Sequence, residues 1–140
     1  MKNILLITLA LMALLNSSCK KEKTKDPLFK LWSVCGNCLP SDVVITLTED
    51  GLYNQDNLKY PDSLFQMAQQ ILIAQPAILC DAATNTYGCA GCYDGSDYFI
   101  EKHCGAVERT WSFDPYDTSQ PATVLEYAQM LRILYRNCTE

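Results

Sequence analysis

The sequence is poor in the residues of hydrolytic catalysis. It has one histidine, His103, and lacks both Gly-x-Ser-x-Gly and His-Glu-x-x-His, the motifs of the elbow-type serine hydrolases and the zincin proteases. His103 precedes Cys104 directly, and neighbours in a strand point to opposite faces, so the two residues do not form a nucleophile–base pair. We expect an exposed His103 and a protein that is not an enzyme.

Basic residues are also few. The 11 Lys and Arg residues are outnumbered by 16 Asp and Glu, which gives a formal net charge of −5. Domains that bind nucleic acid carry a clustered excess of basic side chains. We therefore expect no nucleic-acid partner.

No apolar run is long enough to span a bilayer, which takes roughly 20 residues. The longest, Ile4–Leu15, has twelve residues and follows the positive charge of Lys2. A basic start, a short apolar run and then small residues are typical of a secretory signal peptide. We predict that residues 1–18 are such a signal and are removed.

The end of this leader carries a candidate lipidation site. Ser17 and Ser18 lead directly into Cys19. This stretch resembles the lipobox of bacterial lipoproteins, in the looser form found in the Bacteroidota, although Asn16 stands where the strict pattern prefers Leu. The resemblance implies that Cys19 becomes the N-terminus and carries lipid, palmitate included. Because Lys20 rather than Asp follows Cys19, the resemblance favours the outer membrane.

The rest of the chain divides into a tether and one domain. Residues 20–27 ("KKEKTKDP") are charged and end in Pro, which predicts a solvated spacer. Residues 28–140 have the size of a single small domain. We expect a protein of the cell envelope, held to the membrane by its lipid, with no cofactor and with a protein as its possible partner.

Seven further cysteines are disulfide candidates. An exported chain meets an oxidising compartment, in which such cysteines normally pair. Because seven is an odd number, at most three bridges form and one thiol is left over, and spacing alone does not determine the connectivity. The candidates are Cys35, Cys38, Cys80, Cys89, Cys92, Cys104 and Cys138.

Four of these cysteines form two Cys-x-x-Cys motifs, "CGNC" from Cys35 and "CAGC" from Cys89. A compact four-cysteine zinc site has a shorter separation, of about 15–20 residues, and we predict no metal. A thioredoxin-like motif opens a helix, whereas Pro and Gly follow these two motifs. Bridging between elements is the prediction, and a thiol-redox or metal-handling lipoprotein is the alternative.

Two pairs of loop acids were candidates for a weak calcium site. They are Asp94 with Asp97 and Asp114 with Asp117. The stretch "DGSD" lacks the rest of a calcium loop. Solvated turn carboxylates are therefore expected at all four positions.

The apolar patterns predict an α+β fold: a small antiparallel sheet with two helices packed on it, in ββα-ββα order, stapled by disulfides. β-branched and aromatic runs mark the strands, a stripe of apolar residues that includes Cys138 marks the last helix, and Arg109 falls on the apolar side of its strand. We expect Cys138 to be bridged to the sheet. The ranges are 28–34, 42–48, 97–103 and 106–113 for strands, and 64–74 and 121–138 for helices.

Two further resemblances concern the domain itself. The segment "VCGNCLPSDVVITLTEDGLY" resembles uncharacterised bacterial envelope domains in which Cys-x-x-Cys leads into a strand and an Asp-Gly turn. The segments "YFIEK", "ERTWSFD" and "PATVLEYAQML" are similar to the hairpin-plus-helix end of the emfourin-type metalloprotease inhibitors. The likenesses imply a binding or inhibitor module. The two motifs leave open either an internal duplication or a chance match.

Overall fold

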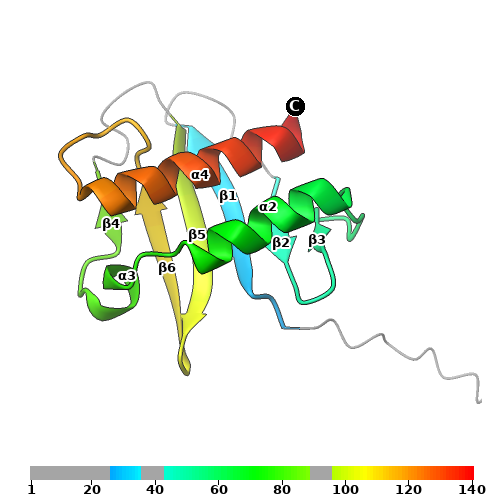
Figure 1. Cartoon of the computed structure of the whole chain (residues 1–140), viewed down its shortest axis with the longest axis horizontal. Coiled ribbons are helices and arrows are strands. Elements are labelled where there is room, and N and C mark those ends of the chain that lie inside the picture. Colours follow the sequence, from blue (N-terminus) through cyan, green and yellow to red (C-terminus); the bar gives the residue numbers. More distant parts are fainter. Residues whose placement is uncertain (1–25, 36–42, 89–95) are drawn as a thin grey trace, which may run out of the picture.

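The structure is a computed structural model that describes residues 26–35, 43–88 and 96–140. In these ranges the fold is α+β, with helices lying against one face of a twisted sheet (Figure 1). The elements, in chain order, are β1 (Phe29–Cys35), β2 (Ile45–Leu47), β3 (Leu52–Tyr53), α2 (Asp62–Ile73), α3 (Ile78–Asp81), β4 (Thr86–Tyr87), β5 (Ser96–Cys104), β6 (Val107–Phe113) and α4 (Ala122–Thr139).

The described sheet has six strands in the order β3-β2-β1-β5-β6-β4. All neighbours are antiparallel except β4, which runs parallel to β6. The sheet is therefore mixed, and neither the expected antiparallel sheet nor the ββα-ββα order is confirmed. The reason is that β3, α3 and β4 have two to four residues each, too few for an apolar period to show in the sequence.

The β5–β6 hairpin is the longest pairing in the sheet. Its register runs from Tyr98 opposite Phe113 to Cys104 opposite Val107, and it confirms the expected hairpin. Gly105 lies in the connection at a φ of 64°, a left-handed conformation that suits glycine. On the other side of β5, β1 pairs over six residues, from Lys30 to Cys35.

The core lies between the sheet and the helices. The predicted helices are confirmed within two residues at each end, and α4 packs on β1, β5 and α2 (Figure 1). Trp111 and Phe113 face the helices, and the Phe113 ring meets the Tyr127 ring edge-on at 5.8 Å. The predicted stripe of α4 is buried: Val124, Tyr127, Ala128, Leu131, Leu134 and Tyr135.

Several predictions concern residues outside the described ranges. The signal peptide, Cys19 and most of the tether precede Asp26, and Cys38, Cys89 and Cys92 also lie outside. Within the described ranges, none of the helices combines the length and apolar character needed to cross a bilayer.

Candidate functional site

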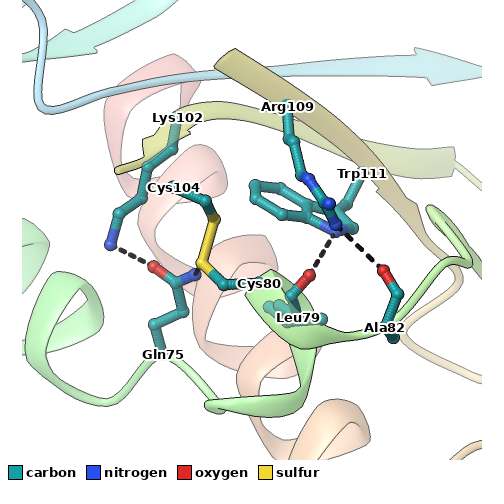
Figure 2. The surroundings of a disulfide bond; sticks show 8 residues. All are labelled: Gln75, Leu79, Cys80, Ala82, Lys102, Cys104, Arg109 and Trp111. Atoms are coloured by element: carbon teal, nitrogen blue, oxygen red, sulfur yellow. Dashed lines mark hydrogen bonds between the residues drawn. A yellow bond between two sulfur atoms is a disulfide. The ribbon is translucent and has the colours of Figure 1, made fainter. Parts of the chain in front are cut away.

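A disulfide joins Cys80 of α3 to Cys104 at the end of β5, with the two Cα atoms 5.6 Å apart (Figure 2). The bond closes a sequence separation of 24 residues. It ties the segment after α2 to the tip of the β5–β6 hairpin, as expected for a bridge between elements. The bridge therefore anchors a four-residue helix that has little stability of its own.

Polar side chains surround this bond (Figure 2). Gln75 Nε2 lies 3.5 Å from Cys80 Sγ and donates to it, while the Lys102 ammonium donates to Gln75 Oε1. Burial lowers the pKa of Lys102. Gln75 therefore links Lys102 to the Cys80 sulfur through its two amide atoms.

The same helix is tied to β6 by two further hydrogen bonds. Trp111 Nε1 donates to the Leu79 backbone oxygen at 3.2 Å, and Arg109 Nη1 donates to the Ala82 backbone oxygen at 2.9 Å. Arg109 does lie on the helix-facing side of β6, as its place in the alternation predicted. Its positive charge lies at the C-terminal end of α3, where a cation interacts favourably with the unpaired backbone carbonyls.

Cys138 carries a free thiol, so the expectation that it is bridged to the sheet is wrong. It lies on the packing side of α4 and is half-buried. Burial raises the pKa of the thiol to about 11. A thiol is nucleophilic as its thiolate, and Cys138 is therefore chemically quiet near neutral pH.

The first Cys-x-x-Cys motif begins at Cys35, where β1 ends. The backbone of Cys35, the last residue of β1, pairs with Ser96, the first residue of β5. The remaining cysteines, Cys38, Cys89 and Cys92, lie outside the described residues.

The other candidates have structural partners. His103 Nε2 lies 3.8 Å from Glu108 Oε1, with both side chains half exposed. Asp114 Oδ1 accepts from the Tyr116 backbone N–H at 2.9 Å, and Asp117 Oδ1 accepts from that of Ser119 at 2.8 Å.

The expectation of a solvated carboxylate is wrong for Asp114, which is buried. The reason is the turn itself, because Gln120 Nε2 donates to the Asp114 and Asp117 backbone oxygens and folds the loop inward. Asp94 lies outside the described ranges. The described residues include no group of three or more His, Cys, Asp or Glu residues placed to hold a metal ion.

Sequence reasoning missed a group of tyrosines and arginines beside α4. The Arg132 guanidinium carbon lies 4.9 Å from the centre of the Tyr116 ring, which is a cation–π contact. The Tyr98 ring meets the Tyr135 ring edge-on at 5.7 Å. The one signal in the sequence was the spacing of Arg132 and Arg136, which places both on one side of the helix.

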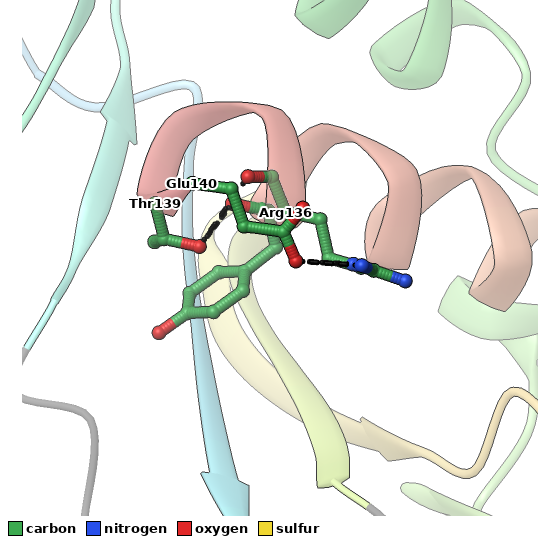
Figure 3. A network of polar contacts seen from close by, with 4 residues as sticks. Arg136, Thr139 and Glu140 are labelled. Atoms are coloured by element: carbon green, nitrogen blue, oxygen red, sulfur yellow. Dashed lines mark hydrogen bonds and ion pairs between the residues drawn. The ribbon is translucent and has the colours of Figure 1, made fainter.

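Arg136 forms an ion pair with Glu140 (Figure 3). Its Nε and Nη2 each lie 2.7 Å from Glu140 Oε1. Hydrogen bonding to Arg136 lowers the pKa of Glu140. Of the two arginines, Arg132 is thus the one that makes no ion pair with a described residue.

The chain was also compared with known proteins. No protein-family model, curated protein or solved structure matches it.

Proposed function

We propose that this chain is a lipid-anchored protein of the cell envelope whose domain, residues 28–140, acts as a binding module. The leader supports export, and Cys19 supports the anchor. Several acyl chains hold a protein on a membrane far more firmly than one. In this proposal the domain displays its surface to a protein partner and performs no reaction of its own.

The observation that carries the proposal is the bond between Cys80 and Cys104. Disulfides persist in exported proteins and are rare in reducing compartments. The bond ties the segment after α2 to a hairpin, and Gln75 donates a hydrogen bond to the Cys80 sulfur. This arrangement suits a structural bridge better than a redox centre. A rigid, stapled small domain is a suitable scaffold for recognition.

Mass analysis of the protein from its native envelope tests the anchor. We expect a chain that begins at Cys19 with acyl groups attached, and a Cys19→Ala variant that leaves the membrane fraction. Protease digestion of intact cells then distinguishes the outer face from the periplasmic face. An unlipidated chain that starts elsewhere would overturn the anchor.

Cross-linking in intact cells tests the binding role. We expect the chain to capture one protein reproducibly. The yield of this cross-linked product should fall when the disulfide of the chain is reduced and the domain unfolds. If the partner is a metalloprotease whose activity falls on binding, the module is an inhibitor, as the likeness to the emfourin type implies. Failure to capture any partner would contradict the binding proposal while leaving the anchor intact.

A second candidate is a thiol-redox or metal-handling lipoprotein. The backbone pairing of Cys35 with Ser96 favours it, because Cys35 belongs to one motif and Ser96 follows the last cysteine of the other by four residues in the sequence. Four thiolates in reach of one another can bind zinc. Thiol counting and metal analysis of the exported protein decide between the two. One free thiol and no metal fit the scaffold, whereas five free thiols or one bound metal fit the alternative.

A further inference from the structure

The connection between β6 and α4 brings two aspartates against the end of β4 (Figure 1). Asp114 follows β6 directly, and its backbone N–H donates to the Tyr87 backbone oxygen at 3.0 Å. A Cβ at the next residue of that segment, Gly88, would lie 2.7 Å from the Asp114 Cβ and 3.2 Å from the Asp117 Cβ. Both aspartates therefore lie against Gly88, and the lack of a side chain at this glycine gives them room.

The carboxylate of Asp114 is buried without an opposite charge among the described residues. Its Oδ1 accepts a hydrogen bond from the Tyr116 backbone N–H at 2.9 Å, yet Asp114 forms no ion pair in the described part of the chain. Buried charges in proteins are paired with opposite charges or coordinate metal ions. One N–H donor does not supply a positive charge, so a cation is the partner expected for this carboxylate.

The side chain of Gln120 leads to the same conclusion independently. It is only 8% exposed, and its Nε2 donates to the backbone oxygens of Asp114 at 2.6 Å and of Asp117 at 3.0 Å. The amide group of Gln120 therefore lies at the same two residues that carry the carboxylates. Its Oε1, bonded to the same carbon as Nε2, is buried and has no hydrogen-bond partner among the described residues. Buried polar atoms nearly always have a partner, and an amide oxygen needs a donor or a cation.

We propose that Asp114, Asp117 and Gln120 form a binding site for one calcium ion. The two carboxylates and Gln120 Oε1 supply oxygen ligands, and water completes the coordination. Calcium accepts carboxylate, amide and backbone oxygens together. The site therefore needs no third acidic residue, which agrees with the absence of a group of three or more His, Cys, Asp or Glu residues placed around a metal in the described ranges.

The donor set favours calcium over the other common divalent ions. All three donors are oxygens, whereas zinc in proteins is bound mainly by Cys and His. Magnesium demands near-ideal octahedral geometry and keeps several waters, while calcium adapts to irregular sets of oxygen ligands on a loop. The inference goes beyond the proposed binding function, and either can fail without the other.

The test titrates the full chain, labelled with nitrogen-15, with calcium chloride and follows it by nuclear magnetic resonance. We expect saturable shifts of the Gln120 side-chain amide and of the backbone N–H signals of Gly88, Tyr116 and Ser119. The Kd should lie at about 10⁻⁴ to 10⁻³ M, the range of calcium modules in extracellular proteins. No saturable shift of these signals up to about 10 mM calcium, well above that range, would overturn the site. An equal or stronger response to magnesium chloride would overturn the calcium assignment.

Two variants make the titration specific. Asp114→Asn removes the charge but keeps an Oδ1 that can accept from Tyr116, and it should raise the Kd about tenfold or more, because calcium affinity depends on the charge of the ligands. Asp56→Asn removes the same charge from an exposed residue after β3, at the opposite edge of the sheet from β4, and should bind as the parent does. Circular dichroism checks that both variants are folded. Unchanged binding by Asp114→Asn, or equal weakening by Asp56→Asn, would show that the site is wrong.

Thermal denaturation gives a second readout, which also serves if Asp114→Asn does not fold. A ligand that binds only the folded state raises the Tm, so calcium should raise the Tm of the parent more than sodium chloride of equal ionic strength does. Asp117→Asn, whose Oδ1 can still accept from the Ser119 backbone N–H, should reduce this rise, and Asp56→Asn should leave it intact. An equal rise in the parent and in Asp117→Asn would contradict the site.

Discussion

Arg109 on the helix-facing side of β6 donates a 2.9 Å hydrogen bond to the backbone oxygen of Ala82, 27 residues earlier. A charge that interrupts an apolar alternation thus ends the short helix α3. Replacing Arg109 with Met leaves that oxygen without its partner, and the free energy of unfolding should fall by about 1–2 kcal/mol. Urea denaturation followed by circular dichroism measures it.

Arg136→Met is the matched control for Arg109→Met. It removes the same charge from an exposed ion pair, and such pairs stabilise a protein little because water screens them. Equal losses in the two variants would show that the contact of Arg109 with Ala82 has no special weight.

The bond between Cys80 and Cys104 should account for a large part of the stability. Chain-entropy estimates for a closed loop of this length give about 3.5 kcal/mol, with a sequence separation of 24 residues. The double variant C80A/C104A should therefore unfold at a clearly lower urea concentration, with hydrogen exchange of α3 increased most. Unchanged exchange at α3 would contradict the view that the bridge anchors this helix.

Cys138 predicts a pH dependence at high pH. Burial raises its pKa to about 11, from 9.0 in the absence of burial. The unfolded chain therefore releases this proton first as the pH rises. The stability tied to the protonated thiol is complete below pH 9 and is lost between pH 9 and 11.

Urea denaturation at pH 8, 9, 10 and 11 measures this loss. Because the tyrosines of the unfolded chain also ionise near pH 10, the quantity of interest is the difference between the parent and Cys138→Ala. The parent should lose more stability than the variant above pH 9. Identical slopes would contradict a buried thiol.

Gly88 and Gly105 form a matched pair, since both have positive φ, at 88° and 64°. A Cβ at Gly88 would lie 2.7 Å from the Asp114 Cβ, whereas one at Gly105 would meet nothing within 4 Å. Gly105→Ala should cost about 1 kcal/mol, for the left-handed backbone alone. Gly88→Ala should cost at least about 2–3 kcal/mol, because overpacking is added. Thermal denaturation compares them, and equal costs would exclude a close contact at Gly88.

The parts of the fold that repeat a pattern over many residues were predictable. The β5–β6 hairpin follows from alternation around Gly105, and α4 follows from its apolar stripe, with one face buried as expected. The alternation of side chains along the strand also predicted that Arg109 lies on the buried side, but it did not predict which group accepts its hydrogen bond. The acceptor is the Ala82 backbone oxygen directly after the four-residue helix α3. A helix this short shows no apolar period that could predict it.

The parts that depend on distant contacts were not predictable. β4 is a strand only because the backbone oxygens of Asn85 and Tyr87 accept hydrogen bonds from Ser112 of β6 and from Asp114 directly after it. Two residues carry no period of their own. The spacing of the cysteines likewise did not reveal that Cys80 pairs with Cys104 or that Cys138 stays free. The contact of Tyr116 with Arg132 arises from the path of a loop along α4, which residue patterns do not encode.

The direction of β1 has a consequence for how the domain would be presented to its surroundings. The chain enters β1 at Phe29, and the strand ends seven residues later at Cys35 (Figure 1), which is about 20 Å away. A membrane tether that precedes Phe29 would therefore be attached to the domain at the end of the sheet where β1 begins. The opposite end, with the Cys35–Ser96 pair and nearby Tyr98, would point away from the lipid. The anchor would then orient the molecule as well as hold it, with the Cys35–Ser96 end of the sheet facing whatever approaches from solution.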